Sequence, residues 1–149
     1  MVAGKAKELA LERFAEKFNC AEATLMGVAS AEGLDCNCIP RIATGFGGGI
    51  GGWGEVCGAL TGAVMAFGLK YGRESAEDTD SKNAVGALVR KLFEAFEKEY
   101  GTVRCYELTE CDMRTPEGMA QAKERDLHNS FCPKFVAFAA EEAQRLIGT

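Results

Sequence analysis

A run of glycines in the first half of the chain constrains its fold more than any other feature. Residues 44–62 read TGFGGGIGGWGEVCGALTG, so a glycine-dense loop leads into small residues with Cys57 at the junction. Glycine adopts positive φ angles without steric cost and lets other groups approach the backbone closely. A helix starting here would place the Cys57 thiol beside unpaired N–H groups and a partial positive charge, which favour the thiolate. The segment predicts a site for a reactive thiolate, a bound anion or a metal ligand.

Length and charge exclude several classes of protein. A chain of 149 residues can bury a core as one domain, and we expect residues 1–149 to form one. Its 17 basic and 22 acidic residues give a net charge of −5 without a basic stripe, which argues against nucleic acid and anionic membrane surfaces. The uncharged stretch 56–69 is shorter than the roughly 20 residues that span a bilayer, so we expect no membrane insertion. The N-terminal segment has no apolar signal-peptide region, and the expected location is cytoplasmic.

Hydrophobic spacing and capping signals predict helices throughout the chain, and no segment shows strand alternation. Asn19, with Glu22 three residues on, forms the sequence pattern of a capping box. The expected helices span 3–18, 20–32, 40–44, 55–71, 81–100 and 116–128, with a last one that opens at 130–133 and ends near 146. The expected fold is therefore all-α: a compact multi-helix bundle in which the glycine-rich loop precedes a central buried helix, 55–71.

Seven cysteines are many for a chain of this size, and their odd number excludes a complete set of internal disulfides. Three of them, Cys20, Cys57 and Cys132, fall at predicted helix starts, where the thiolate is favoured. If these helix starts converge, they form a pocket suited to a cluster, a metal or an anionic substrate. The pair Cys36 and Cys38 could chelate a soft metal, form a disulfide or have no role. His128 is the one histidine, and its place at the end of an exposed-looking helix predicts a surface residue.

Nucleotide binding fits the glycine run poorly. The pattern G-x-G-x-x-G occurs twice in it, but no strand precedes the run and no Gly-Lys-Ser/Thr sequence ends it, so neither a Rossmann fingerprint nor a P-loop is indicated. No C-x-x-C-H sequence is present, so covalent haem is not expected. The glycines that remain candidates for holding a cofactor are Gly47, Gly48, Gly49, Gly51, Gly52 and Gly58.

The chain resembles the family named for the pattern C_GCAxxG_C_C. The resemblance rests on NCAEA at 19–23, on IATGFGGGIG at 42–51 followed by CGALTG at 57–62, and on the order of Cys105 and Cys132. It implies redox activity, which is inferred for the family from its four cysteines, with no reaction assigned. The family is also similar to a region of the split-Soret cytochromes c, which implies a helical homodimer. Cys36, Cys38 and Cys111 lie outside the pattern, and their roles stay open.

Three functions agree with these observations. The first is thiol–disulfide or electron-transfer chemistry with an unidentified redox partner, in which Cys57 is the leading thiolate and Cys20, Cys105 and Cys132 assist it. The second is a metal ion or iron–sulfur cluster held by the same four cysteines. The third is a structural or small-ligand module with inert buried cysteines. Whether the protein is an enzyme stays open, because the sequence contains no clear acid–base pair.

Overall fold

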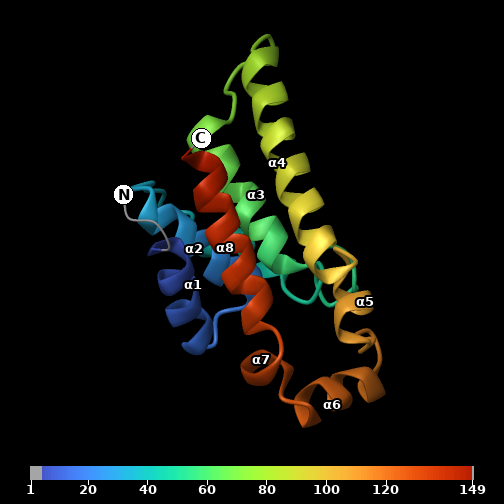
Figure 1. The fold of residues 1–149 in the computed structure, drawn as a ribbon. Helices are drawn as coiled ribbons and strands as arrows, with labels where there is room; N and C mark the ends of the chain where they lie inside the picture. The colour runs from blue at the N-terminus through green and yellow to red at the C-terminus, as the bar shows by residue number, and fades with distance from the viewer. Residues whose placement is uncertain (1–4, 149) are drawn as a thin grey trace.

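The computed structural model describes residues 5–148, and their backbone is helical except for loops and one isolated bridge, which confirms the all-α prediction (Figure 1). The elements are α1 (Lys5–Ala15), α2 (Cys20–Ala31), the 3-10 helix η1 (Arg41–Phe46), α3 (Gly58–Tyr71), α4 (Thr79–Tyr100), α5 (Cys105–Thr109), α6 (Pro116–Glu124), α7 (Leu127–Ser130) and α8 (Pro133–Ile147). Within this described part, no helix has both the length and the apolar character needed to cross a membrane.

The core lies where α1, α2, α3 and α8 pack together, and α4 runs along α3 and α8 (Figure 1). Helix α3 is buried along most of its length, as predicted for a central helix, and Leu60 and Phe67 are fully enclosed. Its small residues allow α2 to approach closely. A Cβ atom at Gly62 would lie 2.4 Å from the carbonyl oxygen of Ala21, so a larger residue would push the two helices apart. The small-residue face of α3 therefore packs against α2 of the same chain.

Local signals define the start of α2. The side chain of Asn19 accepts a hydrogen bond from the N–H of Glu22 (2.8 Å), and the Glu22 carboxylate accepts one from the N–H of Asn19 (2.8 Å), which confirms the predicted capping box. The Asn19 amide also donates to the carbonyl of Thr44 (3.0 Å), and the Thr44 hydroxyl donates to Glu22 (2.7 Å). The cap therefore ties the start of α2 to η1, which leads into the glycine loop.

Two predicted helices have the wrong bounds for reasons outside their own sequence. Helix α3 begins at Gly58 rather than at Glu55, because Val56 forms an antiparallel bridge with Arg104 and the segment before Cys57 is extended. The Glu55 carboxylate pairs with Arg104 (3.2 Å) instead of capping the helix. The helix expected over 116–128 breaks into α6 and α7 at Asp126, whose φ of 50° lies in the left-handed region.

The glycine loop makes a left-handed turn. The φ angles of residues 48–52 lie between 59° and 76°, a region that glycine enters freely and that Ile50 also adopts here. At Gly49 a side chain is excluded outright, because a Cβ would lie 2.6 Å from the Glu55 nitrogen and 2.7 Å from the Cys105 Cβ. The carbonyl of Gly49 accepts a hydrogen bond from the N–H of Glu55 (3.0 Å). The loop therefore folds back tightly and brings residues 105 and 57 to the same end of the bundle.

Candidate redox site

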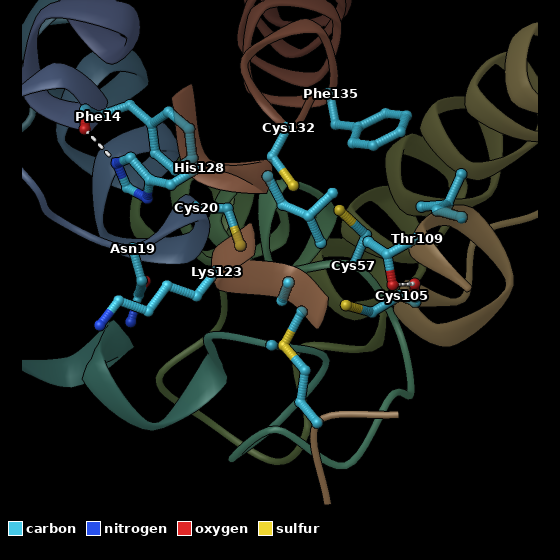
Figure 2. A pocket seen from close by; sticks show the side chains of 15 residues that line it. Phe14, Asn19, Cys20, Cys57, Cys105, Thr109, Lys123, His128, Cys132 and Phe135 are labelled. Atoms are coloured by element: carbon cyan, nitrogen blue, oxygen red, sulfur yellow. Dashed lines mark hydrogen bonds between the residues drawn. The ribbon is translucent and has the colours of Figure 1, made fainter. Parts of the chain in front are cut away.

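The family-pattern cysteines Cys20, Cys57, Cys105 and Cys132 line one pocket (Figure 2). Each lies at the start of a helix: Cys20 opens α2, Cys57 precedes α3, Cys105 opens the short α5, and Cys132 precedes α8. The predicted positions of Cys20, Cys57 and Cys132 at helix starts are confirmed. Figure 2 shows their side chains turned towards a common cavity of about 310 Å³.

Cys20 and Cys57 interact directly in this pocket, where a hydrogen bond joins their side chains. The Cys57 thiol is 5% exposed, whereas Cys20 is half-buried. Gly58 makes room for the pair, since a Cβ at this position would lie 2.4 Å from the Cys20 sulfur. The pattern Cys57-Gly58 is therefore needed for contact between two sulfur atoms that are far apart in the sequence.

The environment shifts the pKa values of the two thiols in opposite directions. The hydrogen bond from Cys57, with further ones from the backbone of Gly48 and Ala21, outweighs burial and lowers the pKa of Cys20 to about 7. The same hydrogen bond and burial raise the pKa of Cys57 well above its ordinary value. These shifts run opposite to the expectation that Cys57 is the leading thiolate. Its place before α3 favours ionisation, but its S–H group donates a hydrogen bond to the Cys20 sulfur, which favours the protonated form of Cys57.

The other two pocket cysteines remain thiols near neutral pH. Burial, and then the charge on Cys20, raises the pKa of Cys105 to about 11. The same two causes, in the same order, raise the pKa of Cys132 to about 12, although Lys134 and Arg125 act against the shift. Their helix starts therefore do not compensate for the loss of water. The pocket combines one sulfur that ionises near neutral pH with three that hold their protons.

His128 and Phe14 form one wall of the pocket and were not expected there. The two rings stack with their centroids 3.8 Å apart, and His128 Nε2 lies 2.6 Å from the carbonyl oxygen of Phe14 (Figure 2). His128 is half-buried, so the prediction of a surface residue is wrong. The break at Asp126 turns α7 inward and causes this difference. No local pattern marks Phe14 or His128 as pocket residues, because α1 and α7 meet only in the folded chain.

The candidate cofactor glycines have different places. Gly48 lines the pocket, and its backbone hydrogen bonds to the Cys20 sulfur. Gly49 packs against the Cys105 Cβ and Gly58 against the Cys20 sulfur. Gly47 packs against Asn19, and Gly51 has no neighbouring group around its Cα in the described structure. Of these glycines, Gly49 and Gly58 leave room for cysteine side chains, and Gly48 adds a backbone contact to the Cys20 sulfur.

The three cysteines outside the family pattern also lie outside the pocket lining. Cys36 and Cys38 form a disulfide bond, which is one of the alternatives that their spacing left open. Cys111 is buried, and its sulfur accepts a hydrogen bond from Arg125 (3.1 Å), whose guanidinium also donates to the carbonyl of Thr109 (2.6 Å). Cys111 therefore helps to hold the α5–α6 connection against the start of α7.

Metal binding receives no support from the side-chain geometry. Across residues 5–148, no group of three or more His, Cys, Asp or Glu side chains is arranged so that it could hold a metal ion. The four pocket cysteines share a cavity without forming such a group. What the geometry does provide is a polarised pair of thiols, Cys20 and Cys57, within an apolar cavity.

An all-helical domain with paired thiols in a pocket is the class of protein that the fold and site define. Comparison with known sequences gives the family: a model described as "Putative redox-active protein (C_GCAxxG_C_C)" matches residues 18–146. The chain belongs to this family, and the predicted resemblance is confirmed. It is also 40% identical over 68 residues to an uncharacterized protein of Archaeoglobus fulgidus; the match covers 45% of each chain. No solved structure matches the chain.

Proposed function

We propose that this protein is a two-electron thiol redox protein in which Cys20 is the nucleophile and Cys57 is its resolving partner. The observation that carries the proposal is the close approach of these two side chains: both line one pocket, Gly58 beside Cys57 leaves room for the Cys20 sulfur, and a hydrogen bond joins the two thiols. Thiol exchange needs an attacking thiolate available near neutral pH and a second thiol within reach. The environment of Cys20 supplies the first, and the adjacent Cys57 supplies the second.

In the oxidising direction the pair forms one S–S bond and loses two electrons. Cys20 starts as a thiolate and bonds to an atom of the acceptor. Cys57 then loses its proton and attacks the Cys20 sulfur, and the bond from Cys20 to the acceptor breaks with its electron pair on the acceptor. Cys105 and Cys132 keep their protons near neutral pH. They therefore compete neither with Cys57 for the bond to Cys20 nor with Cys20 for the acceptor.

The test is a redox titration of the folded protein in dithiothreitol buffers of stepped potential, with peptide mapping of the disulfides. We expect a Cys20–Cys57 disulfide to appear as one two-electron transition, which peptide mapping separates from that of the Cys36–Cys38 disulfide. Cys20→Ser and Cys57→Ser should each remove this transition, whereas Cys111→Ser should retain it, because Cys111 lies outside the pocket lining. Full oxidation of the protein without a Cys20–Cys57 disulfide would refute the proposal.

A further inference from the structure

The size and lining of the pocket limit the kind of electron acceptor that can bind next to these thiols. Its volume of about 310 Å³ lies at the small end of the roughly 300–1,000 Å³ typical of small-molecule sites. Apolar side chains from five helices and one loop form most of the wall: Phe14, Leu108, Met113, Ala122, Leu127 and Phe135. A compact apolar ring fits such a cavity, because its burial removes hydrophobic surface from water and leaves few polar groups without hydrogen-bond partners.

The polar side chains that line the pocket are largely committed to the fold. Asn19 caps α2 and donates to Thr44, and the Thr109 hydroxyl donates to the carbonyl of Cys105 (2.9 Å). His128 Nε2 contacts the carbonyl of Phe14. Lys123 is the exposed residue of the lining, and its side chain extends away from the four cysteine sulfurs (Figure 2). The cavity therefore offers little recognition to a peptide or to a ligand with several carboxylates.

Access to the sulfur atoms separates small acceptors from protein acceptors. Cys57 is 5% exposed, and the sulfurs of both Cys20 and Cys57 face the interior of the cavity (Figure 2). A disulfide on the folded surface of another protein would have to enter this cavity to reach Cys20. A flat molecule without a bulky backbone can lie against the pair, and the two thiols together supply the two electrons that it must accept.

We propose that the acceptor at this site is a quinone, whose ring lies among the apolar side chains of the cavity. This inference rests on the proposed Cys20–Cys57 dithiol. The Cys20 thiolate forms a bond to a quinone carbon. Cys57 gives up its proton and attacks the Cys20 sulfur, the S–S bond forms, and the C–S bond breaks with its electron pair on the ring. The hydroquinone receives one proton from Cys57 and one from water, so that two electrons and two protons balance.

The experiment uses duroquinone, a benzoquinone whose four non-carbonyl ring carbons each carry a methyl group. It has no ring hydrogen that a thiol could displace. Reduced, desalted protein is mixed with duroquinone without oxygen, and the loss of quinone absorbance is followed. We expect one hydroquinone for each Cys20–Cys57 disulfide that peptide mapping finds, and a rate that saturates with quinone concentration. Ala122→Trp, which fills the lined cavity, should lower the rate by about tenfold or more. Ala120→Trp, on the exposed side of α6, is the matched control and should not change the rate.

The outcomes separate this inference from the proposed function. If dithiothreitol buffers produce the Cys20–Cys57 disulfide but the duroquinone rate does not saturate, the quinone assignment fails and the dithiol remains. Faster oxidation by glutathione disulfide than by duroquinone would have the same meaning. If neither reagent links Cys20 to Cys57, both proposals fail. Should Ala122→Trp not fold, saturation of the unmodified protein decides the question.

Discussion

Removal of the Cys57 thiol gives the sharpest test of how the pocket activates Cys20. The hydrogen bond from Cys57 is the largest cause that lowers the pKa of Cys20 to about 7, so about half of Cys20 is thiolate at pH 7. In Cys57→Ala, burial and the backbone hydrogen bonds act against each other, and we expect a pKa near the ordinary value of 9.0. At pH 7 the thiolate fraction would then be about 1%, which is about fiftyfold lower.

The rate should fall less than the thiolate fraction, because a thiolate of higher pKa is a stronger nucleophile. With a Brønsted coefficient of about 0.4–0.5, a rise of about two pKa units increases its reactivity by about sixfold to tenfold. The net expectation is therefore a fall of about fivefold to eightfold at pH 7, together with a shift of the pH midpoint from about 7 to about 9. The assay is alkylation of Cys20 by iodoacetamide between pH 5.5 and 10, read by mass spectrometry.

Two further variants show whether the shift belongs to the hydrogen bond. Cys57→Ser keeps a donor at the same place and should keep the midpoint closer to 7 than Cys57→Ala does. Cys111→Ala removes a buried thiol outside the pocket lining and should leave the midpoint unchanged. A midpoint that stays near 7 in Cys57→Ala would refute the reasoning, because the backbone alone would then stabilise the thiolate.

The remaining predictions concern stability. Gly62→Ala should lower the free energy of unfolding by about 1–3 kcal/mol, because its Cβ would meet the α2 backbone at 2.4 Å. Gly68→Ala, in the same helix with nothing within 4 Å, should raise it by up to about 1 kcal/mol, and equal urea midpoints would contradict the packing argument. Asn19→Ala should cost about 0.5–2 kcal/mol in the same assay through loss of the cap, and an unchanged midpoint would show that α2 does not need it. In the reduced protein, the lowered pKa of Cys20 means that stability from this group rises between pH 7 and 9 and is lost on acidification through pH 7. The raised pKa of Cys105 means that its contribution is full below pH 9 and is lost as the pH rises towards 11, so Cys105→Ala should flatten the alkaline fall in the unfolding free energy, and an unaltered fall would contradict the assignment.

Local sequence was sufficient for the helices and for the positions of three cysteines at helix starts. The capping box at Asn19 and the proline after Cys132 act within a few residues of themselves, so their effect can be read without the fold. The glycine pattern also predicted close packing around Cys57, since few other residues could occupy those backbone positions. Membership of the redox-active family followed from the same residues.

Contacts between distant segments decided the rest. The bridge between Val56 and Arg104 delayed the start of α3, and the left-handed turn at Asp126 moved His128 from the surface into the pocket wall. Which thiol ionises depends on which one donates to the other, and that geometry is created when α2 packs against α3. The sequence by itself determined an all-α domain with cysteines at helix starts. Only the tertiary structure decided that Cys20 accepts a hydrogen bond from Cys57, because hydrogen bonding and burial are properties of the packed chain.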